Sequence, residues 1–298
     1  MIVILNDYIR GTVANEETFW SRLEKELDNA VAISTAKLNI PLQEKIKEFN
    51  PNLIVQNANW GKLTDYKTIS FLQDPFIDMK KLFEPFWLRM RLKIRKRASY
   101  ENKIQLQMEA LNNSIRVTNS NFMAKMYHKA GDFHIIPMGV DHELFKPMEK
   151  KELRKKYNLP MNKTIKIFVG STHKIKGFEK IKKMINNDTA SFWILVLKDV
   201  DFGIGHNFIT FHKISQEILA ELYNCADLLV SRSLVESFGL ASIEAMFCDL
   251  PVDTTKTGIF WDWDPNMNNP RDEAIKKGLD KNTWMTRWKE LVHDCIEN

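Results

Sequence analysis

The chain has 298 residues, of which 44% are hydrophobic and 11 are glycine, so its composition excludes a disordered or fibrous protein and predicts one large domain or two of ordinary size. The net charge is +5, and the longest apolar runs, such as 192–197, are too short to span a bilayer. Three cysteines without a C-x-x-C spacing argue against a disulfide scaffold or a zinc site and favour a reducing cytoplasm.

The first half of the chain alternates short apolar segments with helical patterns. Residues 1–5 carry no basic side chain, so they predict a first core strand and not a signal peptide. An amphipathic helix is expected at 17–27, and further strands are expected at 31–33, 53–55, 68–72 and 115–118. This alternation predicts an open, mainly parallel α/β sheet, which binds ligands beyond the carboxyl ends of its strands. The turn residues expected at that edge are Gly11, Asn57, Trp60, Gln73 and Asp74.

Residues 80–103 form a basic segment, with nine Lys and Arg against two Glu, interleaved with aromatic and aliphatic residues. Three interpretations fit this pattern. In the first, the segment is a surface helix whose cations are solvated. In the second, it contacts a membrane surface or an anionic glycan. In the third, it follows a nucleic-acid backbone, with Phe86 or Trp87 as a stacking platform. Arg89 and Arg91 are therefore candidates for contact with an acceptor substrate.

Residues 136–147 are punctuated by Gly and Pro, which is typical of a domain boundary. We expect an N-terminal domain at 1–140 and a C-terminal domain at 141–281. A helical pattern at 284–296 predicts a last helix, within about 282–298. Residues 1–140 contain 20 Lys and Arg against 15 Asp and Glu, whereas 141–298 contain 23 of each, so the whole basic excess lies in the first half. His142 is expected to be a linker residue and not a ligand.

The second half repeats the α/β alternation. Strands are expected at 165–169, 192–197, 208–211 and 226–230, and helices at 150–157 and 216–225. The last of these strands runs into a polar turn, and a helical pattern begins at Leu240. Gly239 lets a ligand approach the backbone there, and the first helical turn offers N–H groups to an anion. Glu236 and Glu244 flank this helix start, and carboxylates beside an anion site are best explained as acceptors of sugar or ribose hydroxyls.

The segment from Glu236 to Glu244, ESFGLASIE, resembles the E-x7-E signature of the retaining, nucleotide-sugar-dependent glycosyltransferases of family 4. The resemblance continues through 250–252 to Gly258, with Asp249 where the family usually has Gly. It implies the GT-B fold, in which two Rossmann-like domains face each other across a cleft, here with a compact N-terminal domain. In this family the first Glu meets the donor sugar, the second meets the nucleotide ribose, and the backbone between them faces sugar and phosphate, here at Ser237, Phe238, Gly239 and Leu240.

Other family features occur in part. Gly170 to Gly177 resembles the loop whose Arg and Lys neutralise the donor diphosphate; Lys176 matches, but Ser171 replaces the Arg, and Lys174 or His173 is a candidate substitute. The resemblance further implies that Gly11 lies near the donor phosphate and that the backbone at His212, Lys213 and Ile214 reads the base. It also implies that the last helix crosses back onto the first domain. Gln73 and Asp74 stand where many relatives have His-Asp.

The expected activity is the transfer of a sugar from a UDP- or GDP-sugar to a hydroxyl, with retention and without a metal or other cofactor. Lys176 and Glu236 are the expected catalytic residues. The acceptor is expected to be a glycan or lipid-linked, at the inner surface of the membrane. A modified DNA base is an alternative acceptor, and a non-catalytic nucleotide-sugar-binding module is an alternative function. Asp262 and Asp264 spell a D-x-D metal motif, but they are expected to form an acidic turn.

Overall fold

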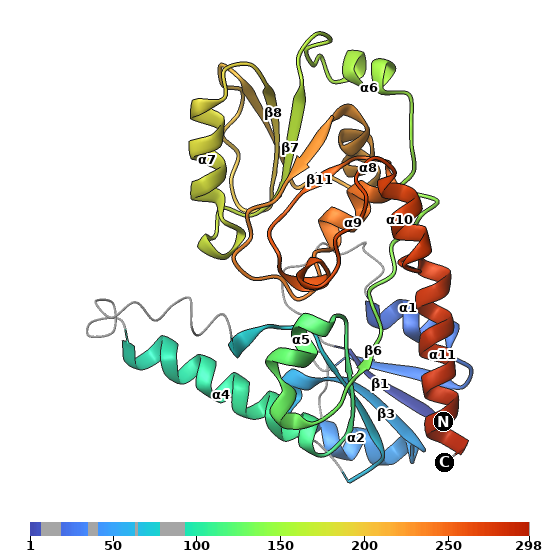
Figure 1. The fold of residues 1–298 in the computed structure, drawn as a ribbon. Helices are drawn as coiled ribbons and strands as arrows, with labels where there is room; N and C mark the ends of the chain where they lie inside the picture. Colours follow the sequence, from blue (N-terminus) through green and yellow to red (C-terminus); the bar gives the residue numbers. More distant parts are fainter. Residues whose placement is uncertain (7–18, 35–40, 63–64, 78–92, 298) are drawn as a thin grey trace. The chain divides into compact units, whose positions relative to one another are not determined.

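The structure is a computed structural model, and it describes residues 1–6, 19–34, 41–62, 65–77 and 93–297. Contacts between Cα atoms divide the chain into two compact units. Unit 1 comprises Met1–Ile136 and Met285–Asn298, and unit 2 comprises Pro137–Trp284. Each unit is an α/β structure built on its own parallel sheet (Figure 1).

The sheet of unit 1 has the strand order β2-β1-β3-β4-β5-β6, and every pairing in it is parallel. Its strands are β1 (Ile2–Asn6), β2 (Ala30–Ser34), β3 (Leu53–Asn57), β4 (Thr68–Leu72), β5 (Ile115–Thr118) and β6 (His134–Ile135). The strands predicted from the apolar segments of the first half are thereby confirmed. The α-helices described in this unit are α1 (Phe19–Glu26), α2 (Leu42–Phe49), α4 (Lys93–Asn112), α5 (Asn121–Met126) and most of α11 (Lys281–Glu297).

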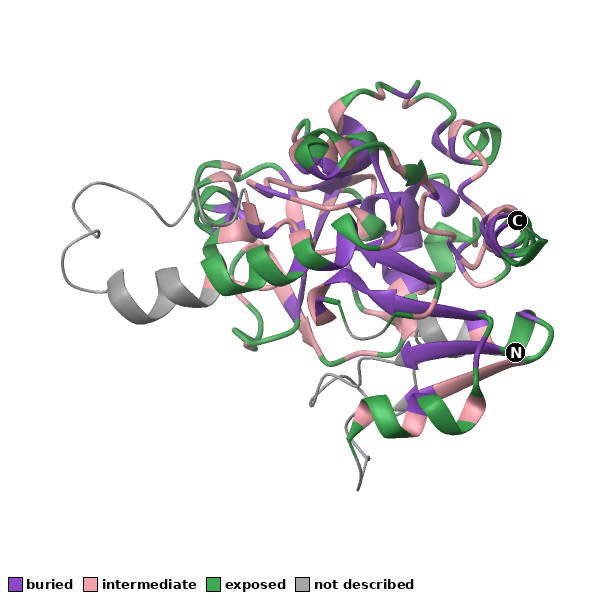
Figure 2. Ribbon diagram, turned by 90° about the horizontal axis from the view of Figure 1, so that it is seen from below, coloured by how far each residue is buried: buried purple, intermediate pink, exposed green. Residues whose placement is uncertain are grey.

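Both faces of this sheet are covered, and apolar side chains from its strands pack on each face. Every residue of β3 and β4 is buried, as expected for parallel strands between two layers of helices. Ile46 of α2 packs with β1 and β3, whereas Leu111 of α4 packs with Leu72. The ring of Trp288 in α11 meets Phe71 edge-on, with centroids 5.4 Å apart. Figure 2 shows the buried residues concentrated in the strands.

The sheet of unit 2 has the order β11-β10-β7-β8-β9 and is also parallel. Its strands are β7 (Ile165–Gly170), β8 (Phe192–Leu197), β9 (Phe208–His212), β10 (Leu228–Val230) and β11 (Val252–Asp253). Its complete α-helices are α6 (Lys150–Lys156), α7 (Phe178–Asn187), α8 (Gln216–Cys225), α9 (Leu240–Phe247) and α10 (Pro270–Lys276). The strands and helices predicted in this half are therefore confirmed, although β10 begins at Leu228.

Alternating side chains of β7 and β8 serve two separate cores. Ile167 and Ile194 pack on the face covered by α8 and α9, whereas Phe168 and Trp193 pack on the face covered by α7 (Figure 1). Because all five strands are parallel, their carboxyl ends share one edge of the sheet, which is where parallel sheets bind ligands.

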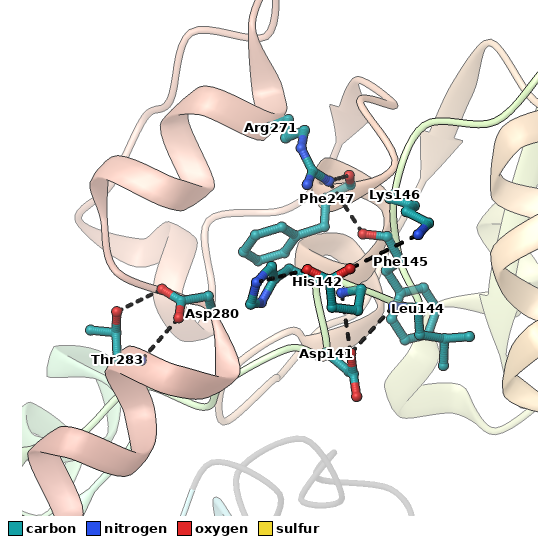
Figure 3. Close-up of polar contacts among 10 residues, drawn as sticks. Asp141, His142, Leu144, Phe145, Lys146, Phe247, Arg271, Asp280 and Thr283 are labelled. Atoms are coloured by element: carbon teal, nitrogen blue, oxygen red, sulfur yellow. Dashed lines mark hydrogen bonds and ion pairs between the residues drawn. The ribbon is translucent and has the colours of Figure 1, made fainter.

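The Gly/Pro-punctuated segment is anchored to unit 2 (Figure 3). Asp141 accepts hydrogen bonds from the N–H groups of Glu143 and Leu144, at 3.2 and 3.3 Å. Arg271 of α10 donates to the carbonyl oxygens of Phe145, at 3.3 Å, and of Phe247. The ring of His142 lies 6.3 Å from that of Phe247. This segment is therefore part of the packed structure of unit 2.

Candidate functional site

Two loops are in direct contact at the carboxyl edge of the sheet of unit 2. One follows β7 and contains the helical turn Lys174–Lys176, and the other, 231–239, follows β10. Because β7 and β10 are parallel neighbours, both loops leave the sheet on the same side. The N–H of Leu234 donates to the carbonyl oxygen of Ile175 at 2.7 Å. A Cβ on Gly177 would lie 1.9 Å from the carbonyl oxygen of Arg232, so only glycine allows this approach.

The contact between the two loops brings together the two predicted catalytic residues. Lys176 Nζ lies 2.7 Å from Glu236 Oε1. Ser233 Oγ donates to the same carboxylate oxygen, also at 2.7 Å. The side chains of Lys176 and Glu236 are 36% and 21% exposed, whereas Ser233 is buried. A cation and a carboxylate are thus held side by side in positions that solvent, and therefore a ligand, can reach.

Residues after β11 fix the loop that carries Glu236. Thr257 Oγ1 accepts a hydrogen bond from the N–H of Glu236 at 2.9 Å, and Thr255 Oγ1 donates to the carbonyl of Ser233 at 2.6 Å. Ser233, Thr255 and Thr257 were not predicted from the sequence. Small hydroxyl residues are common in turns, so no local signal distinguishes those that support a site.

Helix α9 begins at the far end of the same loop. Gly239, its N-cap, has a φ of 103°, which is in the left-handed region that favours glycine. Leu240, the first helical residue, is 40% exposed. The N–H groups of the first turn of a helix have no acceptor within the helix and carry the positive end of its dipole. The start of α9, which follows the loop that carries Glu236, therefore has the partial positive charge that suits an anion.

Glu244 lies one turn further along α9 and is only 8% exposed. Its Oε2 accepts a hydrogen bond from the hydroxyl of Tyr223 at 3.1 Å. Burial, together with the charge of Glu244, raises the pKa of the Tyr223 hydroxyl well above its ordinary value, so this hydroxyl remains a donor. The carboxylate is held in place and has little contact with solvent.

The loop after β7 contains a serine where a second cation was expected. The next residue, Thr172, is hydrogen-bonded to Asp199, whose carboxylate accepts a hydrogen bond from the Thr172 N–H at 3.0 Å. Burial raises the pKa of Asp199, but the hydrogen bonds from Thr172 outweigh it and hold that pKa below its ordinary value. His173 Nδ1 accepts from the N–H of Ile175 at 3.3 Å.

Lys174 is exposed, and Gly170 lies beside Lys176: a Cβ on Gly170 would be 3.8 Å from Lys176 Cβ. Arg232 is a cation that the sequence analysis did not single out. Its guanidinium is paired with both carboxylate oxygens of Asp253, at 2.9 and 2.5 Å. Positive charge near the β7 loop thus comes from Lys174, Lys176 and Arg232.

The residues predicted to read the base lie at the end of β9. His212 Nδ1 is 2.9 Å from the carbonyl oxygen of Leu197, at the end of the neighbouring strand β8. Lys213 has a φ of 50°, and Ile214 packs against the core. The side chain of His212 thus links two strands, while the backbone turns sharply at the carboxyl edge.

The acceptor-side candidates that the structure describes lie at the carboxyl edge of unit 1. Asn57 ends β3 and accepts from the N–H of Asn59 at 2.9 Å, and Asn59 Nδ2 donates to Asp74 Oδ2 at 2.5 Å. Trp60 follows β3 in a short helical turn, and Gln73 directly follows β4. These residues form one polar group at the ends of two adjacent strands. Gly11, Arg89 and Arg91 lie outside the described residues.

The described part of the basic segment is the start of helix α4, at Lys93. Lys103 Nζ lies 4.8 Å from the centre of the Phe76 ring, and Gln107, one turn later, is fully buried. Residues 78–92, which include Phe86 and Trp87, are outside the described residues. None of the helices in the described ranges is long and apolar enough to cross a bilayer.

The D-x-D sequence lies in a turn of unit 2. Asp262 follows a helical turn, and the carboxylate of Asp264 lies 3.0 Å from Lys256 Nζ. In the ranges covered by the structure, no group of three or more His, Cys, Asp or Glu side chains is placed to hold a metal ion.

Residues 149–262, which include both of these loops, the one after β7 and the one after β10, match the family model of the Glycosyl transferases group 1. D-inositol 3-phosphate glycosyltransferase 1 of Catenulispora acidiphila is 27% identical over 148 residues, covering 42% of this chain and 35% of that protein. The chain thus spans about a third of the length of the curated relatives that it matches.

Solved structures resemble the whole chain. A glycosyltransferase from Rickettsia africae aligns with a TM-score of 0.64 at 14% identity and covers 100% of this chain and 98% of that one. Anabaena Alr3699/HepE in complex with UDP and glucose aligns with a TM-score of 0.63 at 14% identity, covering 97% and 94%. Together with the two parallel sheets, these likenesses show that the chain has the GT-B fold of glycosyltransferases.

Proposed function

We propose that this chain is a retaining glycosyltransferase of family 4, which transfers a sugar from a nucleoside-diphosphate sugar to a hydroxyl of a glycan or a lipid-linked acceptor. The observation that carries the proposal is the pairing of Lys176 with Glu236 beside the start of α9, within the region that matches the Glycosyl transferases group 1. A cation, a carboxylate and a helix N-terminus suit the two parts of such a donor, its phosphates and its sugar.

The charges that develop during transfer explain the roles of these groups. The departing nucleoside diphosphate gains negative charge, which Lys176 and the N–H groups at the start of α9 stabilise from fixed positions. Glu236 accepts hydrogen bonds from hydroxyls of the donor sugar and orients it. The departing phosphate takes the proton of the acceptor hydroxyl on the face it leaves, and this gives retention. Because protein groups supply the positive charge, the reaction is proposed to need no metal.

Glu244 is proposed to bind the ribose of the nucleotide. A carboxylate that is fixed by Tyr223 and largely shielded from water makes a stronger hydrogen bond to a hydroxyl than a freely solvated one does. The structure of the Anabaena protein, which was solved with UDP and glucose, supports UDP-glucose as the first donor to test.

A thermal-shift screen with UDP-, GDP- and ADP-glucose tests this proposal, because a ligand that binds only the folded protein raises its Tm. We expect one of the three nucleotide sugars to raise the Tm of the wild type. The same nucleotide sugar should raise the Tm of Lys176→Ala much less. No shift with any of the nucleotide sugars would contradict the proposal. Sugar release is then measured without an acceptor and in the presence of EDTA. Nucleotide binding without release under any condition would favour the non-catalytic module.

A further inference from the structure

Arg232 lies where three loops of unit 2 meet. Strand β10 runs between β7 and β11 in the sheet, and the three strands are parallel, so the chain leaves all of them at the same edge. Arg232 is the second residue after β10, and its carbonyl oxygen is the atom that Gly177 of the β7 loop approaches closely. On the other side of β10, the register pairs Val230 with Asp253, the last residue of β11. Arg232 is therefore placed to connect the loop after β10 with the loops on both sides of it.

The guanidinium of Arg232 binds both the side chain and the backbone of Asp253. Nη1 donates to Asp253 Oδ1 at 2.9 Å and to the Asp253 carbonyl oxygen at 3.0 Å, and Nη2 donates to Asp253 Oδ2 at 2.5 Å. Nη1 also donates to the carbonyl oxygen of Ser231 at 2.9 Å. The planar, forked guanidinium makes this set of hydrogen bonds, whereas the single ammonium of a lysine does not reproduce its geometry.

The hydrogen bonds that fix Glu236 lie directly beyond this arginine–aspartate pair. Thr255 Oγ1 donates to the carbonyl of Ser233 at 2.6 Å, and Thr257 Oγ1 accepts from the Glu236 N–H at 2.9 Å. Both threonines follow β11 and both of their partners follow β10. These bonds form only if the two loops are held at the right separation, and the arginine–aspartate pair stands at the base of both loops.

Solvent reaches the pair in part, because the side chains of Arg232 and Asp253 are 20% and 47% exposed. An ion pair with this much exposure contributes little to stability by itself. We propose that Arg232 and Asp253 are positioning residues of the candidate site. The pair fixes the loop after β10 against the loop after β11, and it thereby keeps Glu236 beside Lys176 without touching the substrate. The effect of the pair on turnover rests on the proposed function, whereas its effect on the loop is measurable without a substrate.

The first test measures hydrogen exchange of backbone amides by NMR, in the absence of any ligand. The N–H groups of Leu234 and Glu236 are both hydrogen-bonded where the loops meet. In Arg232→Lys and in Asp253→Asn, we expect these two amides to exchange about tenfold faster than in the wild type, because the loop opens more easily. Unchanged exchange at both amides in both variants would overturn the inference.

A second arginine–aspartate pair of unit 2 supplies the matched control. Arg154 Nη2 lies 2.6 Å from Asp227 Oδ2, and the same oxygen accepts from the N–H of Ile165, the first residue of β7, at 2.8 Å. This pair therefore lies at the amino edge of the sheet, away from the candidate site. Arg154→Lys should speed exchange at Ile165 and leave the two loop amides unchanged, and Arg232→Lys should do the reverse. Faster exchange of the loop amides in Arg154→Lys as well would show a general loss of stability and would overturn the inference.

The second test measures turnover without an acceptor, using the nucleotide sugar, UDP-, GDP- or ADP-glucose, that raises the Tm of the wild type. We expect Arg232→Lys and Asp253→Asn each to lower kcat about tenfold, while the KM of the donor stays within about threefold of the wild type. The variant that carries both substitutions should lose no more than either single variant, since each substitution alone already breaks the pair. Arg154→Lys should turn over the donor as the wild type does.

Two results of the turnover test would overturn the inference. A rise in KM at unchanged kcat would show that Arg232 binds the donor itself, and a fall in Tm at unchanged kcat would show that the pair is only structural. A wild type that turns over no nucleotide sugar would count against the proposed function instead, and the exchange measurements would still test the pair.

Discussion

Lys176 Nζ and Glu236 Oε1 lie 2.7 Å apart, although the two residues come from different loops. The two side chains neutralise each other, so neither charge is left uncompensated at the surface. In the proposed function, a diphosphate sugar would present phosphate to the cation and hydroxyls to the carboxylate. Substitution of the residues that position this pair therefore tests the proposal.

Ser233→Ala removes a hydroxyl that positions Glu236 from a buried site. We expect turnover of the donor to fall about 3–10-fold, which corresponds to the loss of about 1 kcal/mol from one hydrogen bond. Ser215→Ala is the control, because Ser215 caps α8 through the N–H of Ile218 and should affect only stability. Equal turnover in the wild type and Ser233→Ala would remove this serine from the site.

Gly177→Ala and Gly239→Ala separate close packing from backbone strain. Both glycines have positive φ, but a Cβ on Gly177 would lie 1.9 Å from a backbone oxygen, whereas one on Gly239 would come no closer than 3.7 Å to Phe260. We expect Gly239→Ala to cost about 1–2 kcal/mol of unfolding free energy and Gly177→Ala distinctly more, because the backbone itself must move. Chemical denaturation measures the unfolding free energy of both variants. Similar losses of unfolding free energy would show that the contact between the two loops tolerates a side chain at Gly177.

Glu244→Gln tests the contact with ribose. The change keeps the shape of the side chain and removes its charge, so the hydrogen bond to a ribose hydroxyl should weaken. We expect the wild type to bind UDP about tenfold more tightly than 2′-deoxy-UDP, and the variant to lose most of that preference. Calorimetry with the two nucleotides measures the ratio. A preference that survives the substitution would place the ribose elsewhere.

Asp188→Asn tests a pH dependence outside the site. Burial raises the pKa of Asp188, but hydrogen bonds from Lys166, at 2.6 Å, and from the Ser191 N–H, at 3.0 Å, outweigh it and lower that pKa to about 2. A depressed carboxyl pKa stabilises the fold above about pH 4, and this contribution disappears as the pH falls towards 2. We expect the variant to lose about 1–2 kcal/mol at pH 7, about half of that at pH 3 and little at about pH 2. A difference independent of pH would contradict this assignment.

The fold and the centre of the candidate site were predictable because their signals are local. Apolar runs mark the strands, and the turn between Val230 and Leu240 carries both Glu236 and Gly239 within a few residues. The departure at Asp249 also has a local explanation. Its φ is 59°, a left-handed conformation that glycine adopts without strain and that Asp tolerates better than most residues.

The supporting residues were not predictable, because their partners are distant in the sequence. Thr257 binds the backbone of Glu236 across 21 residues, and Thr255 binds that of Ser233 across 22 residues. Serine, threonine and asparagine occur in many turns, so their presence at a strand end carries little information until the strand order is known. Arg232 was missed for the same reason, since its partner Asp253 lies on the next strand.

The most direct test of the central claim compares the turnover of the bound nucleotide sugar by Lys176→Ala and by Lys183→Ala. Both variants remove one lysine from unit 2, but Lys176 pairs with Glu236 whereas Lys183 is exposed on α7. We predict that Lys176→Ala lowers kcat about 100-fold or more with little change in Tm, while Lys183→Ala stays within about threefold of the wild type. Near-normal turnover in Lys176→Ala would contradict the account.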